Sequence, residues 1–281
     1  MDKNRGNKMT VKLVSNEKIA ETSSKGNQEK WFDKETNKWY KLDQFGYEAL
    51  AETLISRLLE KSNISSDTPF SFAKYQMERL NVHSRDRTGC SSESFLKSGQ
   101  SIITLSHLFS RQLGISLKDK LTKLTSDKKQ IEYLATATAE FTGLKKFPEY
   151  LTILFEVDAL FLNDDRHLNN IAVLEKNGRF DYCPIFDNGA GLLSNTQLSP
   201  MDIEPKELIK SVIARPLGIT FNRQMNTARA LFGKQLKIPQ FTGKEITAEL
   251  KQMLEFYAER DRELITDRVV KCILERQKFN Q

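Results

Sequence analysis

Three side chains in one stretch of the chain have the types and the spacing that phosphate chemistry uses. The stretch is NDDRHLNNIAVLEKNGRFDYCPIFDNG, residues 163–189, and it contains Asp165, Asn170 and Asp187. Carboxylate and amide oxygens suit a hard cation such as Mg²⁺, which takes few protein ligands and completes its shell with phosphate and water. Any one of these residues alone is also typical of an ordinary polar loop, so the prediction rests on their joint placement.

A β-hairpin is the element that would bring these side chains together. IAVLE and FDYCPIF are rich in β-branched and aromatic residues, and the Asn177–Gly178 pair between them is a strong short-range hairpin signal. If the chain folds back at Gly178, Asn170 and Asp187 come to the same open end. Asp165 lies just outside that end, in the loop that follows an apolar helix. The pattern therefore predicts two carboxylates and one amide at a single spot.

The first third of the chain predicts short strands and one helix. Residues 12–24 and 29–43 read as strands joined by polar turns, and residues 46–64 carry apolar side chains at helical spacing. Residues 69–80 read as a strand, with a sheet edge as one option. Residues 85–101, rich in Ser and Gly, read as the connector between two halves.

Beyond the connector the chain predicts mostly helices, interrupted by the hairpin stretch. The expected helices are 101–114, 127–143, 147–163 and several from residue 205 to the C-terminus. The expected class is α+β. A small mixed half, residues 1–98 with the connector, precedes a larger, mostly helical half, residues 99–281, which carries the hairpin.

Composition sets only broad limits. The chain has 281 residues, 39% hydrophobic and 28% charged, with a formal net charge of +6, which is ordinary for a soluble globular protein. Its three cysteines lie far apart and give neither zinc spacing nor a disulfide framework. The first residues lack the apolar core of a secretory signal, and the longest apolar run is too short to span a bilayer. A cytoplasmic location is the expectation.

The hairpin motifs resemble those of the atypical kinases. DRHLNN, with Asp165, His167 and Asn170, followed by FDNG with Asp187, resembles the catalytic loop and metal-binding motif of the HipA-like kinases and, more distantly, of the phosphoinositide kinases. The resemblance extends through KGNQEKWF, WYKLD, GYEALAETLISRLL and GCSSESFL, roughly residues 15–230. It implies a two-lobed protein-kinase-like fold, with ATP and Mg²⁺ as cofactors. It also implies phosphoryl transfer to a serine or threonine of a protein, with autophosphorylation.

The resemblance assigns roles to the hairpin residues. Asp165 would accept or orient the proton of the attacking hydroxyl, and His167 would hold the catalytic loop by hydrogen bonds. Asn170 and Asp187 would bind Mg²⁺ that bridges the nucleotide phosphates. Asp164 is a rival of Asp165, because it stands at the same distance from Asn169, but only Asp165 has a histidine two positions later.

The nucleotide would also meet residues of the first half. Lys41 is the expected cation on the inner phosphates, and by resemblance it pairs with a helix glutamate. Glu48 and Glu52 both qualify, one turn apart on the same face, with Glu48 preferred. Gly26 and Ser24 lie in the expected phosphate-covering loop, which has a single glycine and so departs from the usual pattern. Ser23 and Ser24 are candidate autophosphorylation sites, and a plain hairpin turn is the alternative.

Two other functions stay open at this level. A lipid or small-molecule kinase of the same fold is one, although residues 190–210 are not notably basic, which disfavours an inositol headgroup. A pseudokinase or a toxin–antitoxin-type binding module, with an antitoxin-like protein partner, is the other. The intact Asp165, Asn170, Asp187 and Lys41 disfavour a dead enzyme. No helix-turn-helix or basic stripe supports direct nucleic-acid binding.

Overall fold

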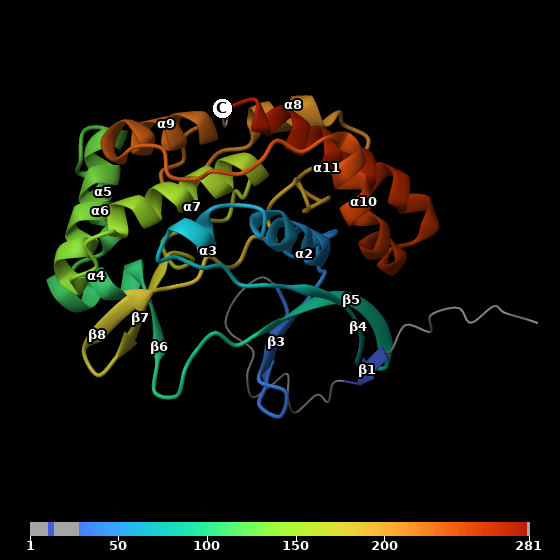
Figure 1. The fold of residues 1–281 in the computed structure, drawn as a ribbon, viewed down its shortest axis with the longest axis horizontal. Coiled ribbons are helices and arrows are strands. Elements are labelled where there is room, and N and C mark those ends of the chain that lie inside the picture. The colour runs from blue at the N-terminus through green and yellow to red at the C-terminus, as the bar shows by residue number, and fades with distance from the viewer. Residues whose placement is uncertain (1–10, 14–27, 280–281) are drawn as a thin grey trace, which may run out of the picture.

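The computed structural model describes residues 11–13 and 28–279, and it divides into a sheet-based lobe and a helical lobe (Figure 1). The smaller lobe is a five-stranded sheet in the order β1-β4-β5-β3-β2. Its strands are β1 (Val11–Leu13), β2 (Lys30–Asp33), β3 (Lys38–Leu42), β4 (Gln76–Val82) and β5 (Arg85–Glu93). The β1–β4 pair is parallel and the other pairs are antiparallel.

A second sheet carries the predicted hairpin. It has the order β6-β7-β8, with β6 (Ser101–Thr104), β7 (Ala172–Lys176) and β8 (Arg179–Tyr182). Asn177 and Gly178 join β7 to β8, and both have positive φ, 52° and 76°. A two-residue turn with positive φ at both positions matches the twist of antiparallel strands, which explains why this pair folds the hairpin as predicted.

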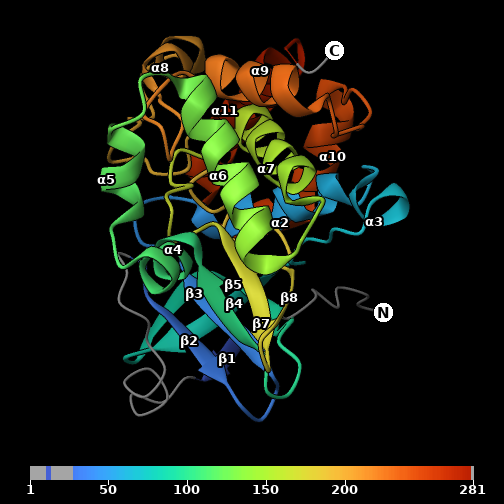
Figure 2. The ribbon, with the colours of Figure 1, turned by 90° about the vertical axis from the view of Figure 1, so that its left-hand side faces the viewer.

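The other regular elements of the described chain are helices. They are α2 (Glu48–Leu59), α3 (Ile64–Asp67), α4 (Leu105–Leu113), α5 (Leu117–Thr122), α6 (Asp127–Thr142), α7 (Phe147–Phe161), α8 (Pro205–Ser211), α9 (Phe221–Phe232), α10 (Gly243–Met253), the short 3₁₀ helix η1 (Leu254–Phe256) and α11 (Glu259–Gln277). Figure 2 shows α6 and α7 side by side above the sheets, with α9 across one end of α7. Within the described residues, no helix has the length and apolar character needed to cross a membrane.

Helix α2 joins the two lobes. Leu50, Leu54 and Leu58 of this helix are buried in the same hydrophobic cluster as Phe155 of α7 and Val269 of α11. Its other side faces the five-stranded sheet, as Figure 1 shows, so α2 is buried along nearly its whole length. The side chains that α2 presents to the sheet are therefore held from both directions.

Residues near the C-terminus return to the sheet lobe and fix it against the helices. The Tyr257 hydroxyl donates to Asp43 Oδ2 (2.7 Å), and the Arg79 guanidinium donates to the carbonyl of Phe256 (2.8 Å). Asp43 Oδ1 in turn accepts the backbone N–H of Ala49 in the first turn of α2 (2.6 Å). This chain of contacts sets where α2 begins relative to the sheet.

Two element predictions were wrong, and both concern strands. Residues 85–93 form β5, a strand with neighbours on both sides, so the connector is shorter than predicted. Ser and Gly suggested a loop there, but Gly89 is needed because a Cβ would stand 2.4 Å from the carbonyl oxygen of Lys41 on β3. Residues 101–104 form β6 and not the start of α4. The strand predicted in residues 69–80 is confirmed over residues 76–80 of β4, and of the two options for its place it is interior, since β4 lies between β1 and β5.

Candidate active site

Lys41 lies at the centre of the candidate site. Its ammonium group forms ion pairs with Glu52 of α2 and with Asp187 Oδ1 (2.6 Å), and all three side chains are largely buried. The ring of Tyr75 lies under the same nitrogen, 5.2 Å from it to the ring centre. Burial alone would lower the pKa of Lys41, but the Asp187 and Glu52 carboxylates raise it well above its ordinary value. A buried, fully charged lysine therefore joins β3, α2 and the hairpin loop.

The preference for Glu48 as the partner of Lys41 was wrong. Glu48 begins α2, and its carboxylate accepts the backbone N–H groups of Phe45 (2.7 Å) and Gly46 (3.1 Å). Glu52, one turn further, reaches Lys41 with one oxygen and the backbone N–H of Asn188 (2.9 Å) with the other. A signal was present in the sequence: an acidic residue in the first helical turn next to a glycine-containing loop is typical of capping.

Arg166 organises the catalytic loop from inside the protein. Its fully buried guanidinium forms an ion pair with Asp158 of α7 (3.0 Å) and donates to the carbonyl oxygens of Phe186 and Asn170 and to Asn188 Oδ1 (2.6 Å). One side chain thus connects the end of α7, the loop before β7 and the loop after β8. From its position in an apolar helix, Asp158 is expected to hydrogen-bond the catalytic loop, and Arg166 to pair with a carboxylate or a phosphate. The Asp158–Arg166 ion pair confirms both expectations, but the contacts of Arg166 with the backbone carbonyls were not predicted.

Asp187 stands in a loop shaped for it. Its φ of 62° is in the left-handed region, and its backbone is held by Tyr75, whose hydroxyl accepts the Asp187 N–H (3.4 Å), and by Asn163, which donates to its carbonyl (3.2 Å). Burial raises the pKa of Asp187, but Lys41 and then Lys30 outweigh this and hold that pKa below its usual range. The carboxylate is therefore ionised at every physiological pH.

The predicted base lies beside this group and faces solvent. Asp165 is exposed, with His167 Nε2 3.9 Å from its Oδ1, and its carbonyl accepts the Asn170 side-chain N–H₂ (2.9 Å) and the backbone N–H of His167 (2.8 Å). Asp165, His167 and Asn170 thus form one hydrogen-bonded turn. The same Arg166 nitrogen donates to the carbonyls of Asn170 and Phe186, so the backbone of Asn170 lies near that of Phe186, the residue before Asp187.

The rival Asp164 differs from Asp165 in its surroundings. Asp164 is half-buried, and burial together with the charge of Asp165 raises its pKa to about 6. Partial desolvation also raises the pKa of the exposed Asp165, with His167 opposing and Asp187 adding to the rise. The pKa values of both carboxyls therefore lie above the ordinary value of aspartate, and for Asp164 the repulsion from Asp165 is part of the cause.

The pH dependence of turnover should reflect the charges around Asp165. A base must be ionised to act, so activity is expected to be lost as pH falls through a pKa above the ordinary 3.8 of aspartate. Arg215→Met removes a positive charge that lowers this pKa, so it should move the acid limb of the kcat/KM profile to higher pH. An acid limb at the same pH in both proteins would contradict this influence of Arg215.

The segment that follows Asp187 packs closely on the loop before α2. Residues 188–196 are held by the Tyr47 hydroxyl, which donates to the carbonyl of Leu192 (2.7 Å), and by the Tyr47 N–H, which donates to Ser194 O (3.2 Å). A Cβ at Gly46 would stand 2.0 Å from the same Ser194 oxygen, so only glycine allows this approach. The metal-motif loop is therefore anchored on both sides of Asp187.

The oxygen ligands at this site suit a Mg²⁺ ion that also binds phosphate better than a metal ion held by protein side chains alone. No group of three or more His, Cys, Asp or Glu side chains that could hold a metal occurs among residues 11–13 and 28–279. The oxygens available at the site are those of Asp187 and Asn170, and Asn170 Oδ1 accepts no hydrogen bond within that described part. Few protein oxygens, with the remaining positions left to phosphate and water, is the usual arrangement for Mg²⁺.

Two predicted nucleotide contacts lie outside the described residues. Ser24 and Gly26, with Ser23, fall in residues 14–27, so they stay predictions. Lys41, Asp165, His167, Asn170 and Asp187 lie together in one connected arrangement.

A matched pair of substitutions separates the two helix glutamates. Glu52→Gln should lower kcat/KM for ATP about tenfold or more, because the loss of a charge-assisted hydrogen bond of ~1.5–3 kcal/mol lets Lys41 shift. Glu48→Gln keeps the Lys41 contacts, and it should cost about 1 kcal/mol of folding stability, as for other capping residues, with a smaller effect on turnover. Steady-state kinetics and urea unfolding of both variants check this. A larger kinetic loss in Glu48→Gln would contradict the assignment.

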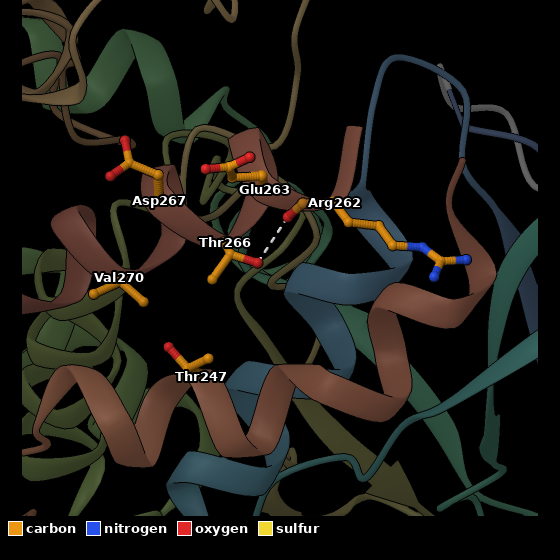
Figure 3. Close-up of a pocket in the computed structure, with 6 residues that line it drawn as sticks. All are labelled: Thr247, Arg262, Glu263, Thr266, Asp267 and Val270. Atoms are coloured by element: carbon orange, nitrogen blue, oxygen red, sulfur yellow. Dashed lines mark hydrogen bonds between the residues drawn. The ribbon is translucent and has the colours of Figure 1, made fainter. Parts of the chain in front are cut away.

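A surface groove lies away from the candidate active site. Figure 3 shows it between α10 and α11, with a volume of about 460 Å³ and Thr247, Arg262, Glu263, Thr266, Asp267 and Val270 in its wall. None of these residues belongs to the candidate active site. Charges of both signs line the groove, which favours no particular ligand.

Comparison with known proteins supports the kinase fold. No family model and no curated protein sequence matches the chain. Among solved structures, the Helicobacter pylori proinflammatory kinase CtkA matches with a TM-score of 0.55 and 14% identity, over 90% of this chain and 92% of that one. Shewanella oneidensis MR-1 HipA, solved with HipB and operator DNA, matches with a TM-score of 0.44 and 12% identity, over 90% of this chain and 64% of that one.

These likenesses concern the fold. The match to CtkA over nearly its whole length confirms the predicted α+β, two-lobed, kinase-like architecture. This match agrees with the kinase resemblance noted from the motifs.

Proposed function

We propose that the protein is an ATP- and Mg²⁺-dependent kinase that phosphorylates a serine or threonine hydroxyl of a protein, including its own chain. The observation that carries the proposal is the Lys41–Glu52–Asp187 arrangement, in which a buried lysine is held between a helix glutamate and the metal-motif aspartate. Removing three charged side chains from water costs free energy. Such buried clusters of charge therefore occur mostly where the groups have a functional role.

Each residue has a role in that reaction. Asp165 takes the proton of the attacking hydroxyl as its oxygen bonds to the terminal phosphorus, the bond to the inner phosphate breaks, and ADP leaves. Lys41 donates to the inner phosphates, and Glu52 holds it there. Asp187 and Asn170 would hold Mg²⁺, which neutralises charge on the phosphates. Arg166 keeps both loops in place, and His167 steadies the turn around Asp165.

The exposure of Asp165 supports a macromolecular acceptor. Its carboxylate is 62% exposed, so a hydroxyl on a large, folded partner or on a second copy of this chain can reach it. A lipid or small-molecule acceptor is the alternative that the experiment must separate. An antitoxin-like partner is a further proposal that rests only on the motif resemblance.

Labelled ATP with Mg²⁺ tests the proposal directly. The protein should transfer label to itself or to a protein of its host lysate, with the modified residue located by mass spectrometry as serine or threonine. The Asp165→Asn variant should transfer none above background. If label appears only in the lipid or small-molecule fraction, the acceptor is not a protein but a lipid or a small molecule. If no fraction is labelled, the kinase proposal is refuted.

A further inference from the structure

Lys30 stands directly opposite Lys41 on the neighbouring strand. The β2–β3 register pairs Lys30 with Lys41, Trp31 with Tyr40, Phe32 with Trp39 and Asp33 with Lys38. Residues that pair across an antiparallel ladder point to the same face of the sheet, with their Cβ atoms ~4.5–5.5 Å apart. Lys30 therefore shares the face on which Lys41 meets Glu52 and Asp187.

Placing these two lysines opposite each other should destabilise the sheet, and no ion pair of Lys30 within the described residues offsets this. Like charges directly opposite each other destabilise a sheet. Lys41 uses its ammonium group on two carboxylates, whereas half-buried Lys30 makes no ion pair with any residue in the described part of the chain. The opposite face of the same hairpin is different, because there Trp31 and Tyr40 stack in a closed apolar cluster.

Lys30 is one strand pairing away from the metal-motif aspartate. Lys41, the residue opposite Lys30, forms an ion pair with Asp187 Oδ1 (2.6 Å). Lys30 belongs to β2, the edge strand of the five-stranded sheet, so no described strand covers it on the side away from Lys41.

We infer that Lys30 is a second phosphate-binding lysine, which contacts the polyphosphate of the nucleotide beside Lys41. The inference rests on the proposed function and adds a residue to it. An anion carrying several charges offsets the repulsion between the two lysines, since each ammonium can donate to a different phosphate oxygen. The contribution of Lys30 should then grow with the number of phosphates on the ligand.

Calorimetric titration with adenosine, ADP–Mg²⁺ and ATP–Mg²⁺ measures this. Lys30→Met should weaken ATP–Mg²⁺ binding about tenfold or more, as expected for one lost charge-assisted hydrogen bond, and ADP–Mg²⁺ less, with adenosine unchanged. Lys30→Arg should recover most of the ATP affinity. Lys38→Met is the matched control, because Lys38 lies on the same hairpin but faces the other side, and it should bind all three ligands like the parent.

The outcomes separate this inference from the proposed function. If the parent binds ATP–Mg²⁺ and Lys30→Met binds it equally well, the inference is wrong and the kinase proposal stands. An equal loss for adenosine and ATP would also overturn it, because it would show a general change of the site. If the parent binds no nucleotide, both proposals fall. Thermal unfolding of Lys30→Met should show no loss of stability, since the substitution removes a cross-strand repulsion.

Discussion

Asp165→Asn should lower kcat by ~10²–10⁴-fold and leave the affinity for ATP–Mg²⁺ nearly unchanged. The substitution keeps the shape of the side chain and removes only its ability to take a proton. The hydrogen bonds that position the turn use the Asp165 carbonyl, not its carboxylate, so the loop should keep its conformation. Single-turnover kinetics together with calorimetry measure the two quantities separately.

Asp164→Asn is the matched control for this prediction. Asp164 is the neighbouring carboxylate with the same spacing to an asparagine, and its substitution should leave most of the turnover at neutral pH. A larger loss of kcat in Asp164→Asn than in Asp165→Asn would mean that the two roles are exchanged. Equal turnover in both variants and the parent would remove the base assignment altogether.

Arg166→Met should destabilise the protein by ~3–5 kcal/mol and abolish turnover. Removing the guanidinium leaves the Asp158 carboxylate buried without its charged partner, and breaking a buried pair from one side costs about this much. It also releases the carbonyls of Phe186 and Asn170 and the side chain of Asn188. Urea unfolding and steady-state kinetics of the variant measure both effects.

A double variant and a surface control test the cause. Adding Asp158→Leu to Arg166→Met removes the stranded charge, so it should recover part of the lost stability but none of the turnover. Arg223→Met breaks an ion pair with Asp127 in which the arginine is 65% exposed, and it should change stability by less than about 1 kcal/mol. An Arg166→Met protein as stable as Arg223→Met would contradict the organising role of Arg166.

The elements that could be predicted are those whose own sequence segment carries the signal. The hairpin could be predicted because Asn177–Gly178 takes positive φ at two successive positions, and α2 because its apolar residues recur at helical spacing. Strand β5 could not, because its identity depends on neighbours far away in the sequence. Gly89 looks like a loop residue until the carbonyl of Lys41 is placed against it.

The same distinction holds for the candidate site. Asp165, Asn170 and Asp187 lie close in sequence around one hairpin, so their convergence could be predicted from spacing. Glu52 and Glu48 are equivalent by helical period, and only the position of the sheet relative to α2 decides between them.

Lys30 and the carbonyl contacts of Arg166 were missed for related reasons. Strand register decides whether Lys30 of β2 faces the site, and no local pattern specifies that register. A buried arginine that bonds backbone carbonyls has no sequence signature beyond its neighbouring motif. Long-range packing, not residue type, supplies both assignments.

Metal-dependent nucleotide binding tests the central claim most directly. Calorimetric titrations of ATP into the parent with Mg²⁺, into the parent with EDTA, and into Asp187→Asn and Asp165→Asn with Mg²⁺ should give two classes. The parent and Asp165→Asn should bind with similar affinity in Mg²⁺, and binding should weaken strongly with EDTA or in Asp187→Asn. Binding that is indifferent to Mg²⁺, or an Asp187→Asn protein that binds like the parent, would contradict the assignment of this site as a kinase active site.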